Sequence, residues 1–209
     1  MTSILKKILL ISTILLNLSC NEKTSEIRFY PSDKYVLDET VEIIGLDTTK
    51  LNFREITNKL EDHYDNKTHM IVQFDDENIT KKILPQVYGN GLVKIKNVLR
   101  IKTDSILIDD GYRISELKRI LKRHYTNNGE IPYYSANYYQ ASVEITIDTN
   151  KTGRDLKQVL KTVTRTFDEI KTEIQDSIKL NIFFSYFRQI PPPPPPPPPP
   201  KSDNEFNDY

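Results

Sequence analysis

The clearest hydrophobic pattern lies in the second half of the chain. Val143, Ile145 and Ile147 alternate with polar residues, which predicts a strand with one buried face. After Gly153 the apolar residues recur every three or four positions, which predicts a one-faced helix of about seven turns. Its apolar positions are Leu156, Val159, Leu160, Val163, Phe167, Ile170, Ile174 and Ile178. Residues 180–187 then form a second expected strand. Because the helix must bury its apolar stripe against a sheet, the pattern predicts an α+β fold with α/β-like character.

The remaining chain predicts further short elements. Apolar runs or alternation predict strands at residues 41–46, 70–74, 92–101, 105–108 and 112–114. Helical spacing predicts helices with apolar faces at residues 53–64, 79–87 and 117–125. The helix at 79–87 is expected to follow a cap formed by residues 75–78. Asp109, Asp110 and Gly111 predict the turn of a hairpin.

Arranged in order, these elements divide the folded part into two modules, residues 27–102 and 103–190. Each is expected to run strand, helix, strand, helix, strand, and in each the helix after the middle strand follows an aspartate, Asp75 or Asp148. This order is compatible with a duplication and also with the ordinary alternation of strands and helices in such chains.

Both ends of the chain differ from the folded part. Lys6 and Lys7 precede an apolar run at residues 8–18, and Cys20 follows. This pattern is typical of a secretory signal peptide, and the apolar run is shorter than the roughly 20 residues that cross a bilayer. The cysteine position resembles a lipobox. We therefore expect a lipoprotein signal peptide at 1–19, lipidation of Cys20, and a short tether at residues 20–26.

Composition narrows the function. The chain has 29 basic and 29 acidic residues, and removal of Lys6 and Lys7 leaves a net charge near −2, which argues against a nucleic-acid partner. Cys20 is the single cysteine, so disulfides cannot stabilise the mature chain. No nucleophile motif and no glycine-rich phosphate loop are present. The three histidines lack ligand spacing. We expect no enzyme activity, no metal and no cofactor.

Aromatic residues outside the predicted core suggest protein contacts. Tyr side chains are enriched at interfaces, so a tyrosine-rich connection and the aromatic residues of the tail are candidate partner-binding residues. They are Tyr133, Tyr134, Tyr138, Tyr139, Phe206 and Tyr209. The tyrosine rings could instead pack back over the sheet. Residues 191–209 begin with ten prolines, which predict a polyproline II spacer of about 31 Å. This tail is either a presented ligand or a repeat without a partner.

Residues 104–187 carry a family resemblance. The run 104–121, with its Asp-Gly turn leading into a helix, and the run 143–156, continued at 167–170, are similar to the periplasmic domain of ExbD/TolR-type biopolymer transport proteins. The family's transmembrane helix with its ionisable Asp has no counterpart in residues 1–20, so the resemblance implies only the periplasmic part. It implies an α/β module that pairs with itself or binds an energy-transducing partner or the cell wall.

Together these observations predict a lipid-anchored protein of the bacterial cell envelope that faces the periplasm from the inner or outer membrane. Its expected role is a non-enzymatic accessory or scaffold in a TonB/Tol-type transport complex, with partners in that machinery or in a second copy. The alternative is a stand-alone structural lipoprotein that binds cell-wall or surface material.

Overall fold

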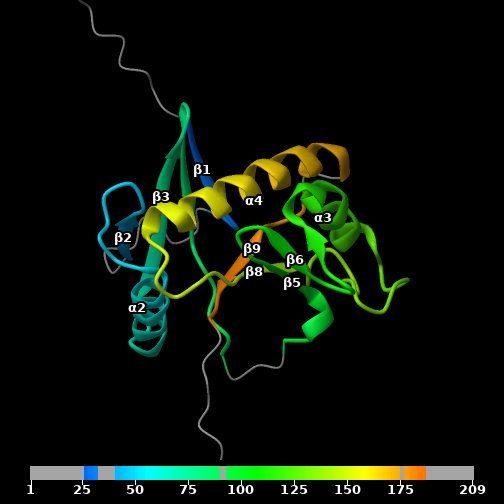
Figure 1. Cartoon of the computed structure of the whole chain (residues 1–209), viewed down its shortest axis with the longest axis horizontal. Helices are drawn as coiled ribbons and strands as arrows, with labels where there is room; N and C mark the ends of the chain where they lie inside the picture. The colour runs from blue at the N-terminus through cyan, green and yellow to red at the C-terminus, as the bar shows by residue number, and fades with distance from the viewer. Residues whose placement is uncertain (1–25, 33–40, 90–92, 175–176, 187–209) are drawn as a thin grey trace, which may run out of the picture.

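The structure is a computed structural model that describes residues 26–32, 41–89, 93–174 and 177–186. Within these ranges the chain forms three α-helices and two mixed β-sheets, with strands and helices interspersed. Figure 1 shows the two sheets side by side, with the long helix lying across both. The predicted α+β class is confirmed.

The first sheet has the strand order β1-β4-β3-β2. Strand β1 is parallel to β4, β2 is parallel to β3, and β3 and β4 form an antiparallel hairpin. Helix α2 connects β2 to β3, and Asn52 caps it through a capping box with Glu55. The bounds are β1 Glu26–Tyr30, β2 Val41–Gly45, α2 Phe53–Asp65, β3 His69–Asp76 and β4 Ile79–Ile83.

The second sheet has the strand order β7-β6-β5-β8-β9. Strands β5, β8 and β9 are parallel, and β6 and β7 extend the sheet as antiparallel neighbours of β5. Helix α3 precedes β8, and helix α4 connects β8 to β9. The bounds are β5 Val98–Ile101, β6 Ser105–Leu107, β7 Tyr112–Arg113, α3 Leu117–Thr126, β8 Ser142–Ile145, α4 Gly153–Ile174 and β9 Asn181–Phe184.

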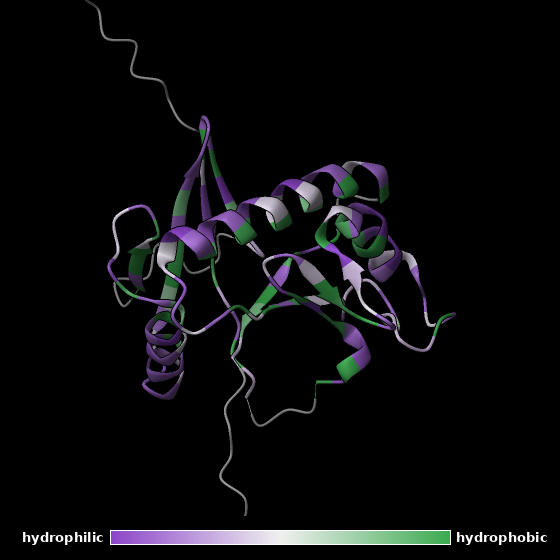
Figure 2. Ribbon diagram, in the orientation of Figure 1, coloured by the Kyte–Doolittle hydropathy of each residue, from purple (hydrophilic) through white to green (hydrophobic). Residues whose placement is uncertain are grey.

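Helix α4 holds the two sheets together. Its predicted apolar stripe is buried from Leu156 to Ile170, and polar and apolar residues alternate along it in Figure 2. Phe167 contacts Tyr30 of the first sheet and Tyr125 of α3, with ring centroids 6.3 and 5.6 Å apart. The cores of both sheets therefore merge beneath one helix.

Two predicted elements are wrong. Residues 79–83 form strand β4 instead of a helix, so the first half does not repeat the order strand, helix, strand, helix, strand. The strand expected at 92–101 begins only at Val98, because Ile95–Asn97 form a 3₁₀ turn, η1. Strand β5 pairs with β6 and β8, so the expected module boundary after residue 102 falls between paired strands of one sheet.

The described chain begins and ends at opposite ends of the molecule. The Glu26 amide donates to the carbonyl of Asn78, at the tip of the β3–β4 hairpin. The Tyr186 hydroxyl donates to Asn58 of α2 over 2.8 Å. In Figure 1 these ends lie at the top and toward the bottom of the view. The first and last described residues are therefore held by different elements, the β3–β4 hairpin and α2.

Candidate partner-binding groove

The structure separates the four tyrosines of the predicted contact loop. Tyr134 is buried, and its ring centroid lies 6.4 Å from that of His124, so this residue belongs to the core. Tyr133 and Tyr139 are exposed by 61% and 68%. Tyr138 is partly exposed and meets Tyr139 edge to face. Three of the four tyrosines are thus accessible, and one performs the packing role that was the alternative.

Two buried asparagines fix the shape of this loop. The Asn127 side chain donates to the carbonyls of Ile131 and Ser135, and accepts from the Ile131 amide. The Asn97 side-chain oxygen accepts from the Ala136 amide over 3.1 Å. Because side chains satisfy these backbone groups, the loop holds one conformation without regular secondary structure. Tyr133 is therefore presented from a fixed loop.

Tyr133 lies over a groove on the outer side of the second sheet. The groove has a volume of about 350 Å³ and combines residues from η1, β5, the end of β6 and the loop. Its lining is Ile95, Lys96, Val98, Arg100, Leu107, Ile108, Asp109, Pro132 and Tyr133. We call this set the Tyr133 groove. Its size lies at the lower end of the range for ligand-sized sites, so it fits one or two side chains of a partner.

Apolar side chains of the groove are exposed to solvent. Ile95 is 75% exposed and Leu107 is 41% exposed, beside the exposed Tyr133 ring. Single exposed apolar residues are common on proteins, but a contiguous set lining a depression marks an interaction site. Only Tyr133 of these three was a predicted site residue.

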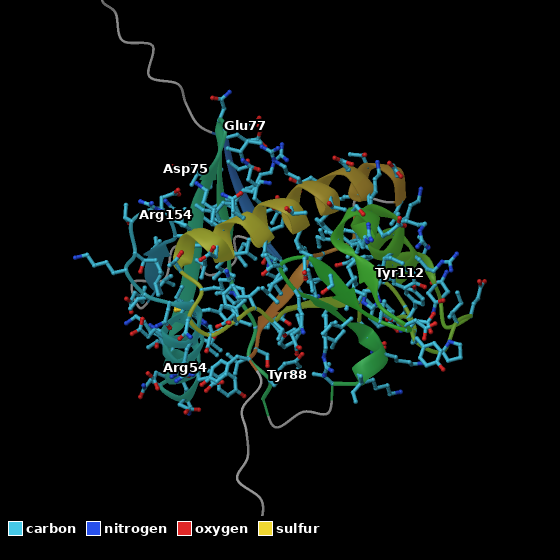
Figure 3. The ribbon with its side chains drawn as sticks, in the orientation of Figure 1. Arg54, Asp75, Glu77, Tyr88, Tyr112 and Arg154 are labelled. Atoms are coloured by element: carbon cyan, nitrogen blue, oxygen red, sulfur yellow. The ribbon has the colours of Figure 1, made fainter. Side chains whose placement is uncertain are left out.

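Charged residues form one wall of the groove. Arg100 of β5 is half-exposed, and its Nε lies 3.1 Å from the Glu144 carboxylate of β8. Tyr88 donates to the same carboxylate and stacks on Phe183, with ring centroids 4.4 Å apart. Burial, assisted by Glu144, raises the pKa of Tyr88. Tyr88 lies toward the bottom of the molecule in Figure 3. These contacts fix Arg100 beside the groove and leave part of its guanidinium accessible.

A second polar cluster lies beneath α4. Lys81 of β4 is 1% exposed and sits 3.0 Å from Asp76, which is 3% exposed. Lys81 also donates to Thr164 of α4. Arg165 makes two hydrogen bonds to Asp76, and Lys161 approaches the same carboxylate at 3.2 Å. Burial alone would raise the pKa of Asp76, but the hydrogen bonds from Arg165, Lys81 and Lys161 outweigh it and lower that pKa. Each charge is paired, so this cluster joins α4 to the hairpin.

The histidines have separate surroundings. His63 bridges Thr68 and Glu42, at 2.7 and 2.9 Å. His124 is fully buried, and its Nε2 donates to the Asn97 carbonyl. Within the described ranges, no group of three or more His, Cys, Asp or Glu side chains is placed to hold a metal ion.

Several predicted features lie outside the described residues. They are the signal peptide, Cys20, the tether up to residue 25, and the tail with Phe206 and Tyr209. None of the helices in the described part is long and apolar enough to cross a membrane.

Comparisons with known proteins add no relative. A scan against protein-family models, a search of curated proteins and a search of solved structures each gave no match.

Proposed function

We propose that this chain is a lipid-anchored, non-enzymatic protein of the bacterial cell envelope that binds another protein through the Tyr133 groove. Its proposed role is an accessory or scaffold in a TonB/Tol-type transport complex. The observation that carries the binding role is the fixed depression in which Ile95, Leu107 and Tyr133 remain exposed beside Arg100.

The position of the chain ends supports an anchored arrangement. A lipid on Cys20 would be joined to β1 through a few residues, and β1 begins at the tip of the β3–β4 hairpin. The labelled Glu77 marks this tip at the top of Figure 3, whereas η1 and β5 lie in the lower half of Figure 1. Anchoring through the N-terminal end would therefore leave the groove accessible to proteins of the envelope.

The order of elements supports the transport assignment. Over the described residues 104–174 and 177–186 the chain forms a strand, an Asp-Gly turn, a short second strand, a helix, a strand, a long helix and a strand. This is the order that the resemblance to ExbD/TolR-type periplasmic domains implies. Fold order alone does not define an activity, so the partner must be tested directly.

The anchor is tested by replacing the acylated residue. We expect the wild-type chain to stay in the membrane fraction after a high-salt wash, because acyl chains bind through buried methylenes and not through charge. Cys20→Ala should move most of the protein to the soluble fraction, as measured by immunoblotting of both fractions. A variant that remains with the membrane would contradict lipid anchoring.

The groove is tested by placing a charge at its centre. Leu107→Asp should abolish co-purification with proton-channel or energy-transducing proteins after mild detergent extraction, because a charged, hydrated carboxylate would replace the apolar side chain on which the partner docks. Ile43→Asp is the matched control, since Ile43 of β2 is 49% exposed but lies on the first sheet. Equal loss in both variants, or no loss in either, would contradict the groove assignment.

A second candidate function follows from another surface. Tyr139 and Tyr138 form an exposed edge-to-face pair with ring centroids 5.7 Å apart. Exposed aromatic pairs suit the stand-alone role in which the protein binds cell-wall or surface material. Sedimentation with purified cell-wall sacculi that is lost in Tyr139→Ala, but kept in Leu107→Asp, would favour this function.

A further inference from the structure

We propose that the Tyr133 groove is occupied by the acidic, aromatic segment Lys201–Tyr209 of a second copy of this chain. The inference rests on the proposed binding role of the groove and names an occupant for it. It makes the tail a self-association element, in a closed pair in which each copy supplies one tail and one groove.

The chemistry of the tail segment matches the lining of the groove. Residues 201–209 contain three acidic residues, one lysine and two aromatic residues, Phe206 and Tyr209. The groove offers Ile95, Leu107 and Tyr133 for a ring, and Lys96 and Arg100 for a carboxylate. Asp109 is the single acidic residue in the lining, and Arg100 also pairs with Glu144 of β8, so Lys96 and the exposed part of Arg100 are the cationic groups offered to the tail. An apolar anchor with flanking opposite charges is a common basis of specific protein contacts.

The direction of the strands argues that the tail reaches another copy. Strands β5, β8 and β9 are parallel, so their C-terminal ends lie together on one side of the sheet and their N-terminal ends on the other. The tail follows the C-terminal end of β9, whereas η1, with Ile95 and Lys96, precedes the N-terminal end of β5. The point at which the tail begins is therefore on the side of the sheet opposite to η1 of the same copy.

The exit point and the spacer reinforce this direction. Tyr186 bonds to Asn58 and its ring lies 6.0 Å from the Arg54 guanidinium, so the chain leaves the fold against α2. Register places Arg100, Glu144 and Phe183 in one row, so β5 and β9 lie about 10 Å apart at two strand spacings. Ten prolines predict a stiff rod of about 31 Å. A rod of that length would be about three times longer than this separation, so it would place residues 201–209 past the same copy's groove and within reach of a neighbour.

Complementation between two defective variants tests this proposal in the full mature chain carrying Cys20→Ala, which removes the lipid. The tail variant is Phe206→Ala with Tyr209→Ala, and the groove variant is Leu107→Asp. Sedimentation velocity should show a concentration-dependent dimer for the parent chain and at least tenfold weaker association for each variant alone. An equimolar mixture should regain dimer, because one copy has an intact groove and the other an intact tail.

A charge exchange adds specificity to the test. Lys96→Glu should weaken association in the mixture, and Glu205→Lys on the copy that supplies the tail should restore it. Ile43→Asp should leave dimerisation unchanged, and circular dichroism should show the same spectrum for all variants. A mixture that associates no better than its components, or a parent chain that stays monomeric at every concentration, would overturn the proposal.

The outcome is separable from that of the proposed function. If Leu107→Asp loses the envelope partner while the tail variant dimerises like the parent chain, the groove binds a partner but not the tail, and only this inference fails. If the tail variant is monomeric and no envelope partner depends on Leu107, the tail docks but the transport role fails.

Discussion

His124 shows how one buried titratable group can set a pH dependence. Its side chain is enclosed by the rings of Tyr125 and Tyr134, and its Nε2 donates to the Asn97 carbonyl over 3.1 Å. Burial lowers the pKa of His124 to about 4, against backbone hydrogen bonds that act in the opposite direction. Folding therefore favours the neutral ring.

This pKa predicts a loss of stability on acidification. The contribution of neutral His124 is fully present above about pH 6.5, the ordinary pKa, and is lost as the pH falls toward 4. Between pH 7 and 4 the parent chain should lose about 3 kcal/mol more unfolding free energy than His124→Gln, which cannot titrate but keeps a donor. Urea unfolding at both pH values measures the difference, and parallel losses in the two proteins would contradict it.

At the same scale, the groove residues show what a sequence pattern can and cannot reveal. Tyr133 was predictable because a tyrosine-rich connection outside the core pattern suggests contacts. Ile95 lies within the expected strand 92–101, but it is part of the η1 turn and faces solvent. Leu107 could have been predicted as an exposed apolar residue, because the unbroken apolar run 106–108 places apolar side chains on both faces of a strand. Glu144 was expected outside and is buried, because Tyr88 and Arg100 cover it.

Among the elements, the β3–β4 hairpin was missed for a physical reason. Ile79, Lys81 and Ile83 lie at alternating positions of β4, and the middle one is a buried lysine. A lysine at an inward-facing position hides the alternation of apolar and polar residues that is typical of a strand. The spacing of Ile79, Ile83, Leu84 and Val87 therefore predicted a helix. The two-residue turn places Glu77 at φ +60°, a conformation that glycine or asparagine would have indicated more clearly. By contrast, α4 was predictable because its stripe is uninterrupted.

The buried ion pairs between this hairpin and α4 predict that loss of Asp76 destabilises the protein more than loss of Lys81. Asp76→Asn leaves Lys81 buried without its nearest counter-ion and should cost about 3–5 kcal/mol of unfolding free energy. Lys81→Met leaves Asp76 with Arg165 and Lys161, so its cost should stay below about 1 kcal/mol. Denaturant unfolding at pH 7 compares the two. A Lys81→Met variant as unstable as Asp76→Asn would contradict this prediction and show that Lys81 is required for the contact between the hairpin and α4.

On the scale of the whole molecule, one helix shared by two sheets predicts cooperative unfolding. Phe167 contacts both halves, and Gln86, which follows the first sheet, donates its backbone amide to Ile182 of β9. If either sheet opened, α4 would lose part of the apolar surface that its buried stripe covers. The halves are therefore expected to unfold as one unit.

Hydrogen exchange can test this coupling with small core changes. Ile145→Val in β8 should lower the exchange free energy of the β3 amides by about 1 kcal/mol, the same as for the β8 amides. Ile83→Val in β4 is the reciprocal variant and should lower β8 protection equally. Protection that falls only in the mutated sheet would mean that the sheets open independently.

The first and last described strands also determine how the fold carries tension. Strand β1 enters from the N-terminal side and forms five register pairs with β4, and β9 forms four with β8 before the chain departs. A pull between the two ends acts along both strands, so the ladder bonds are loaded in shear and must fail together instead of one at a time. Attached to a surface at one end and held by its tail at the other, this chain would act as a stiff mechanical link.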